Sequence, residues 1–123
     1  MTNVTCAIIL FDNKVLVAQR SEIMKLPLKW EFPGGKLEKD ESEEDCIIRE
    51  IKEELQVEIS IIKKLKSITH SYSDVEIELI PFVCSLIEGD INLTEHIEYR
   101  WLNKEALSTI DLCEADSKII SEL

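Results

Sequence analysis

The chain has 123 residues, of which 45% are hydrophobic and 32% are charged, and we expect residues 1–123 to form a single domain because domains commonly contain about 100 to 150 residues. The net charge of −11 argues against sequence-independent binding to a nucleic-acid polymer, which requires clustered Lys and Arg. No run approaches the roughly 20 apolar residues of a membrane span, and the N-terminus lacks the basic start of a signal peptide, so a cytoplasmic protein without a membrane partner is expected.

The four cysteines lie far apart in the sequence and match neither a zinc motif nor a disulfide scaffold. We expect them to be reduced and mostly buried as small apolar side chains. The alternative, a nucleophilic thiolate, lacks a neighbouring cluster of bases in the sequence. They are Cys6, Cys46, Cys84 and Cys113.

The first segments of the chain predict a β-hairpin and a short strand. Residues 4–10 and 14–20 are apolar, β-branched runs, and Asp12-Asn13 between them is typical of a turn. After a loop, residues 30–35 predict a brief strand that ends in a glycine turn. Gly34 and Gly35 in this turn permit backbone conformations that would point a carbonyl toward a metal, and the alternative is an ordinary turn.

The helix expected next has an apolar face and an acidic face. Ser42, with Asp45 three residues later, resembles a capping box and predicts a helix over 43–55. At about 100° per residue, four aliphatic side chains share one arc and three glutamates share the adjoining arc. Like charges at this spacing repel, and a divalent cation such as Mg²⁺ would offset the repulsion; the alternative is a solvated acidic face. The two groups are Ile47, Ile48, Ile51 and Leu55, and Glu50, Glu53 and Glu54.

The second half of the chain predicts further strands and two helical segments. Strand-like runs cover residues 57–69, 75–87 and 99–102, and a turn is expected after the second run. Residues 104–107 are weakly helical, and 114–123 predict a closing helix. This order indicates a mixed β-sheet covered by helices, an α/β (α+β) fold.

The spacing of the acidic residues resembles the signature of the Nudix family. The family pattern is Gly, five residues, Glu, seven residues, Arg-Glu, an aliphatic residue, any residue, Glu-Glu, any residue, Gly and an aliphatic residue. Gln56 replaces the final glycine, at a cost of about 1 kcal/mol if the left-handed conformation is kept. The segment 30–38 is similar to that of MutT-type and CTP pyrophosphohydrolase members. The resemblance implies an α/β/α Nudix sandwich. The matching residues, within the box at 35–57, are Gly35, Glu41, Arg49, Glu50, Ile51, Glu53, Glu54 and Val57.

The resemblance also implies roles for the acids of the box. Glu50, Glu53 and Glu54 are similar to metal-binding and water-activating acids, with Glu50 as the candidate base. Gly34 would add its carbonyl as a ligand. The expected cofactor is Mg²⁺, with Mn²⁺ as the alternative.

Two further residues would support these acids. Arg49 is expected to pair with Glu41 and to hold the helix glutamates in place. Glu95, at a loop position similar to that of MutT-type chains, is a second candidate base or ligand; the alternative is a solvated loop acid. His96 and His70 are assigned no role.

The implied reaction is hydrolysis of a small nucleoside triphosphate to a monophosphate and pyrophosphate, by a monomer or a homodimer. Arg20 and Lys25 are candidate substrate contacts, and the alternative for Arg20 is a solvated strand end. Glu31 and Phe32 are expected to border the base.

Asp116 stands where MutT carries an asparagine that recognises the base. An ionised aspartate only accepts hydrogen bonds, which favours the amino group of cytosine and hence CTP or dCTP, modified forms included. The alternative for Asp116 is a cap on the last helix. The alternatives for the protein are an enzyme for 8-oxo-dGTP, one for ADP-ribose, or a non-catalytic nucleotide sensor.

Overall fold

The computed structural model describes all 123 residues. No helix in it is both long and apolar enough to span a membrane. The elements follow in the order β1 (Thr2–Phe11), β2 (Lys14–Gln19), β3 (Trp30–Glu31), β4 (Gly34–Lys36), α1 (Glu43–Leu55), β5 (Glu58–Lys64), β6 (Ile68–Ser71), β7 (Glu76–Glu88), β8 (Glu98–Leu102), the 3₁₀ helix η1 (Lys104–Thr109), α2 (Glu114–Ser117) and the 3₁₀ helix η2 (Ile120–Glu122).

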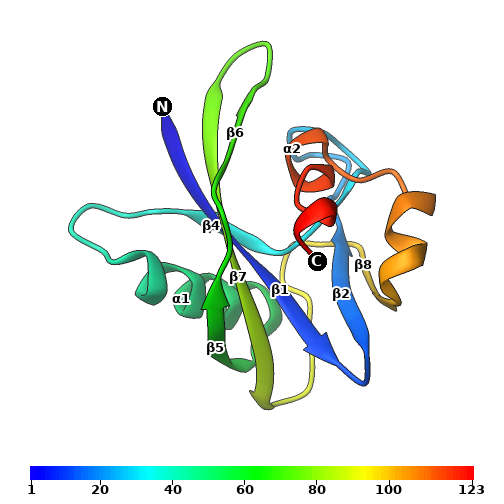
Figure 1. Cartoon of the computed structure of the whole chain (residues 1–123). Helices are drawn as coiled ribbons and strands as arrows, with labels where there is room; N and C mark the ends of the chain where they lie inside the picture. The colour runs from blue at the N-terminus through cyan, green and yellow to red at the C-terminus, as the bar shows by residue number, and fades with distance from the viewer.

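The strands form one mixed sheet, as the sequence predicts. Its order is β3-β2-β1-β7-β5, and β4 pairs with β1, β6 with β7 and β8 with β2. The pairing of β1 with β7 is parallel, and the other pairings are antiparallel. Figure 1 shows β1 and β7 side by side at the centre, with α1 and α2 on opposite sides of them. Helices therefore cover both faces, which confirms the predicted fold class.

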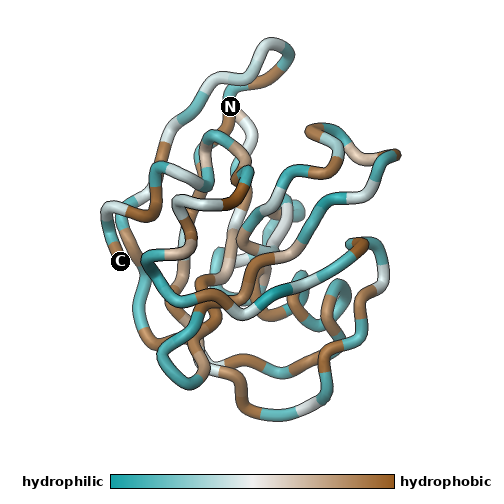
Figure 2. Tube along the Cα trace, turned by 90° about the vertical axis from the view of Figure 1, so that its right-hand side faces the viewer, coloured by the Kyte–Doolittle hydropathy of each residue, from teal (hydrophilic) through white to brown (hydrophobic).

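Alternation along the strands builds a separate apolar core on each face. Cys6 and Ile8 of β1 face the cluster that contains Ile119, whereas Ala7 and Ile9 face the cluster that contains Ile51 of α1. Hydrophilic and hydrophobic stretches alternate along the chain trace in Figure 2. Successive side chains of a strand point to opposite faces, so β1 contributes to both cores at once.

The predicted hairpin and helix are both confirmed. Asp12 and Asn13 have φ values of 52° and 62°, the two left-handed residues that a tight hairpin turn requires. The helix α1 spans the predicted residues, and the Ser42 side chain accepts a hydrogen bond from the Asp45 amide at 3.1 Å. Gln56 ends the helix in the left-handed conformation, with φ 60° and ψ 36°.

Three details differ from the sequence prediction. The glycine pair lies in the strand β4 rather than in a turn. The run 57–69 is divided into β5 and β6, and the break lies beside Pro81 of β7, which has no amide hydrogen to continue the ladder. The closing helix is one α-helical turn, because its backbone then changes to hydrogen bonds between residues three apart, such as Glu122 to Ile119.

The predicted cysteine state is confirmed, since all four thiols are free and buried. Burial raises the pKa of the Cys84 and Cys113 thiols to about 12. Such thiols are protonated at neutral pH and act as packing groups.

Candidate active site

A cleft of about 600 Å³ opens beside β1, β3 and β4, and all five predicted substrate contacts line it. The loop before β3, the turn between β6 and β7, and α2 complete its walls. Glu50, Glu53 and Glu95 do not line it, and Glu95 borders a neighbouring depression formed by Ser21 to Met24 together with Thr94 and Ile97. The predicted residues that line the cleft are Arg20, Lys25, Glu31, Phe32, Gly34, Gly35, Glu54 and Asp116.

The two glycines of β4 serve close packing, which corrects the predicted turn. A Cβ at Gly34 would lie 2.6 Å from the Cys6 Cα and 2.8 Å from the carbonyl carbon of Thr5. A Cβ at Gly35 would lie 2.6 Å from a carboxylate oxygen of Glu50. Neither glycine has a positive φ. The first glycine lets β4 pair with β1, and the second leaves room for the Glu50 carboxylate.

Glu54 lies half-buried at the inner end of the acidic arc. Its Oε1 accepts a hydrogen bond from the Gly34 amide at 3.1 Å, so the contact of Gly34 with α1 runs through its amide rather than its carbonyl. Burial, together with the carboxylates of Glu31, Glu50 and Glu95, raises the pKa of the Glu54 carboxyl to about 9. Four acids therefore share one region, and one of them holds a proton at neutral pH.

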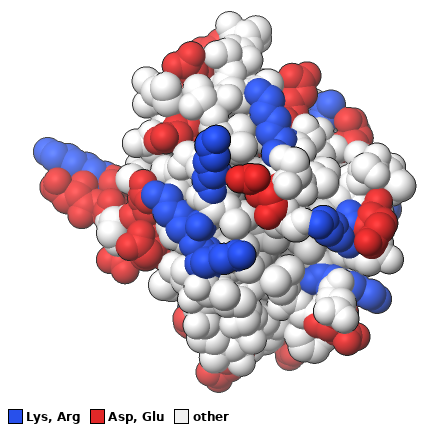
Figure 3. Space-filling view, viewed as in Figure 1, with Lys and Arg blue, Asp and Glu red and all other residues white.

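Arg49 joins the acids of α1 to the loop before the helix. Its guanidinium donates to both oxygens of Glu41 at 2.7 and 2.9 Å, which is the predicted pair, and to Glu50 at 2.9 Å. It also contacts Glu53 at 3.2 Å. The Arg49 guanidinium lowers the pKa of Glu41 to about 2. In Figure 3 this loop projects at the left and is crowded with charged side chains.

The acids match a hard divalent cation by chemistry but are not assembled into a metal site. No three His, Cys, Asp or Glu side chains form a preformed metal-binding group. Arg49 holds Glu50 and Glu53, while Glu54 is directed toward Gly34. Carboxylate oxygens are the ligands that Mg²⁺ prefers, and a cation among these acids would replace the proton of Glu54. The residues therefore fit such an ion once their side chains adjust.

Asp116 of α2 also lines the cleft. It is only 7% exposed, and its Oδ2 accepts a hydrogen bond from the Phe32 amide at 2.8 Å. Burial and the Glu31 carboxylate raise its pKa to about 8. The helix α2 is preceded by Cys113, so the side chain of Asp116 does not cap it.

Glu31 of β3 and Arg20, which directly follows β2, form an ion pair that lines the same cleft. Glu31 Oε1 lies 2.7 Å from Arg20 Nη1, with side chains that are 14% and 21% exposed. Arg20 is therefore neither a solvated strand end nor a free cation. Lys25 pairs with Asp74 across the mouth of the cleft at 2.9 Å, and both of these side chains are well exposed.

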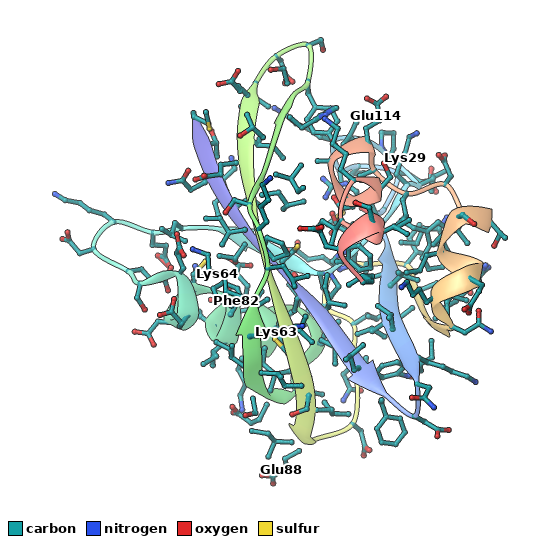
Figure 4. All side chains as sticks on the ribbon, in the orientation of Figure 1. Lys29, Lys63, Lys64, Phe82, Glu88 and Glu114 are labelled. Atoms are coloured by element: carbon teal, nitrogen blue, oxygen red, sulfur yellow. The ribbon has the colours of Figure 1, made fainter.

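Sequence reasoning missed two residues of this region. His96, which received no role, is buried and lies 2.7 Å from Glu31 Oε2. Tyr72 lines the cleft, and its hydroxyl accepts a hydrogen bond from the Ala115 amide, next to Asp116, at 3.0 Å. His70 stacks edge-on against Tyr72 and lies 3.2 Å from Glu114, which Figure 4 marks at α2. Both missed contacts join residues far apart in the sequence, and no local pattern signals them.

Comparisons with known proteins identify the family. A model of the NUDIX domain matches residues 4–122. The chain is 32% identical to the CTP pyrophosphohydrolase of Escherichia coli K12 over 120 residues, which cover 98% of this chain and 89% of that protein. It is 37% identical over 83 residues to the 8-oxo-dGTP diphosphatase of Proteus vulgaris, covering 68% of this chain and 72% of that protein.

A solved structure agrees with this assignment. The MutT protein of methicillin-resistant Staphylococcus aureus 252 is 42% identical to the chain and superposes with a TM-score of 0.79, covering 98% of this chain and 93% of that one. Its sheet and helices are thus arranged as in the chain described above. This chain belongs to the Nudix hydrolase family.

Proposed function

We propose that residues 1–123 act as one domain that hydrolyses nucleoside triphosphates to a monophosphate and pyrophosphate, with Mg²⁺ and a preference for CTP or dCTP, including modified forms. One relative that matches almost the whole chain, at 32% identity, is named for CTP. The observation that carries the proposal is that Glu54 of α1 and Asp116 line the same cleft, with Glu31 near both of them. In this arrangement the triphosphate would lie beside Glu54 and the base beside Asp116.

The acids of α1 are the proposed metal ligands. Glu50, Glu53 and Glu54 would hold the cation, with the Gly34 carbonyl and Glu95 as further ligands. When bound, the cation neutralises triphosphate oxygens and lowers the pKa of a water molecule. Mn²⁺ is the alternative ion.

Residues of the chain itself would position the substrate and accept the proton of the attacking water. Glu50 is the proposed base and Glu95 the second candidate; Arg49 holds Glu50 at 2.9 Å and so limits the positions of its carboxylate. Arg20 and Lys25 line the cleft and would contact the phosphates or the sugar. Their ion pairs with Glu31 and Asp74 are the contacts that a triphosphate would replace or extend.

The base preference depends on the charge of Asp116. Its Oδ2 already accepts from Phe32, so Oδ1 is the oxygen left for the substrate. When ionised, this oxygen accepts from the amino group of cytosine. When protonated, it donates, and a donor suits the O6 of an oxidised guanine. The raised pKa of Asp116 therefore supports 8-oxo-dGTP as the second candidate.

A substrate panel tests the proposal. The purified protein is incubated with Mg²⁺ and CTP, dCTP, 5-methyl-dCTP, 8-oxo-dGTP, dGTP or ADP-ribose, and monophosphate and pyrophosphate are measured beside a Glu50→Gln control. Cytidine-selective release that Glu50→Gln abolishes is the expected result. Selective cleavage of 8-oxo-dGTP would show that the preferred base is an oxidised guanine rather than cytosine. Cleavage of ADP-ribose would show that the substrate class is not the nucleoside triphosphates. Binding without turnover would favour a nucleotide sensor.

A further inference from the structure

His96 is a buried side chain with one polar partner. Its side chain is 0% exposed, and Nε2 lies 2.7 Å from Glu31 Oε2, whereas Nδ1 has no hydrogen-bond partner. A carboxylate accepts, so Nε2 is the donor. A buried ring nitrogen without a partner is unfavourable, and an apolar side chain would fill the same space without that cost. The contact with Glu31 is thus the only polar interaction that distinguishes histidine from leucine at this position.

Glu31 is held from both sides. Oε1 is paired with Arg20 at 2.7 Å and Oε2 with His96 at 2.7 Å, so each carboxylate oxygen has a fixed partner. Arg20 in turn donates through Nε to the Lys25 carbonyl in the loop that lines the cleft. The orientation of Arg20, a proposed substrate contact, therefore depends on Glu31, and that of Glu31 depends on His96.

His96 also completes the attachment of the loop that carries Glu95. On one side of Glu95, the Thr94 amide donates to the Glu54 carbonyl at the end of α1 at 3.2 Å. On the other side, the Ile97 amide donates to the Gln19 carbonyl of β2 at 3.0 Å. The side chain of His96 adds a third attachment, to β3. The loop is thus joined to a helix and two strands within four residues.

We propose that His96 is a positioning residue: its hydrogen bond to Glu31 orients the Glu31–Arg20 pair in the cleft and keeps the Glu95 loop at a fixed distance from β3. This inference rests on the proposed triphosphate hydrolysis. It predicts that the length of the side chain at position 96, and not only its polarity, determines how tightly substrate binds.

Two variants of His96 separate the effect of side-chain length from the effect of polarity. In His96→Gln the amide nitrogen extends about as far as Nε2 and can still donate to Glu31, whereas His96→Asn is one methylene shorter. We expect KM for CTP with Mg²⁺ to rise about 10-fold or more in His96→Asn, as for other residues that support a site, and to stay within about 3-fold of wild type in His96→Gln. The matched control is Asn103→Ser at the start of η1, outside the cleft, which is expected to leave KM unchanged.

A double-mutant cycle shows whether His96 acts through Glu31. If it does, His96→Asn in the Glu31→Ala background, which has no acceptor for position 96, adds less than about 3-fold to KM, whereas independent effects multiply. Multiplying effects, or equal KM values for His96→Gln and His96→Asn, would overturn the proposal. Thermal unfolding of each variant shows that the comparison is made between folded proteins.

The proposed function is checked first on the wild type. If the wild type cleaves no member of the panel, the hydrolase proposal fails. In that case, Kd for CTP is measured by calorimetry for the same variants and for the double-mutant cycle. A Kd that rises in His96→Asn but not in His96→Gln supports the positioning role, and equal values contradict it.

Discussion

The two adjacent glycines of β4 should respond in opposite ways to the same added methyl group. In Gly34→Ala the new Cβ meets the backbone of β1, at 2.6 Å from the Cys6 Cα. In Gly35→Ala the nearest atoms belong to the carboxylate of Glu50, the end of a flexible side chain. Both glycines have ordinary φ values, so the contrast comes from contacts alone. The first change is expected to damage the fold and the second the chemistry.

The magnitudes follow from what must move. Separating β4 from β1 resembles overpacking and costs about 1–3 kcal/mol in Gly34→Ala, which lowers Tm by roughly 4–12 °C in a domain of this size. Rotating Glu50 away from Gly35 costs about 0.5–1.5 kcal/mol. It also displaces the proposed base, so kcat of Gly35→Ala should fall about 100-fold or more.

Urea unfolding and steady-state kinetics on the two variants provide the test. Each variant serves as the control for the other, because the substitution is the same and the positions are adjacent. A Gly35→Ala enzyme with wild-type kcat would refute the assignment of Glu50 as the catalytic base. A Gly34→Ala protein as stable as wild type would refute the close pairing of β4 with β1.

Three further substitutions have defined outcomes. Gln56→Gly relieves a left-handed non-glycine residue and should raise the free energy of unfolding by up to about 1 kcal/mol in urea titrations, with kcat unchanged. Arg49→Lys loses the two-point contact with Glu41 and should lower kcat about 10- to 100-fold while circular dichroism stays unchanged. Asp116 has a folded pKa of about 8 against an ordinary 3.8, so its contribution to stability is fully present below pH 3.8 and is lost as pH rises through 8. Asp116→Asn keeps an oxygen for the Phe32 amide but cannot ionise, so its stability relative to wild type should increase between pH 4 and pH 8; a constant difference in urea unfolding would contradict this.

Turns, helix caps and helix ends depend on neighbouring residues and could be predicted from the sequence. The Asp12-Asn13 turn and the Ser42 cap use side chains and φ angles within a few residues, and both are present. The left-handed conformation of Gln56 follows from the position of the helix end, even without the usual glycine. The Arg49–Glu41 pair was also anticipated, from the resemblance to the Nudix box.

Contacts between distant segments were not predictable in this way. A Gly-Gly pair is typical of a turn, and only the neighbouring strand β1 and the Glu50 carboxylate reveal why β4 needs glycine while remaining extended. The burial of His96 against Glu31 joins residues 65 positions apart. Phe82, near the centre of Figure 4, packs in the core beneath α1, although its strand begins 21 residues after the helix ends.

The position of water attack tests the central claim most directly. Wild-type protein is incubated with CTP and Mg²⁺ in ¹⁸O-labelled water, and the products are resolved by ³¹P NMR and mass spectrometry. Hydrolysis to a monophosphate and pyrophosphate predicts CMP and pyrophosphate in equal amounts, with no orthophosphate and one labelled oxygen between them. CDP with labelled orthophosphate would place the attack at the terminal phosphorus and contradict the proposed reaction.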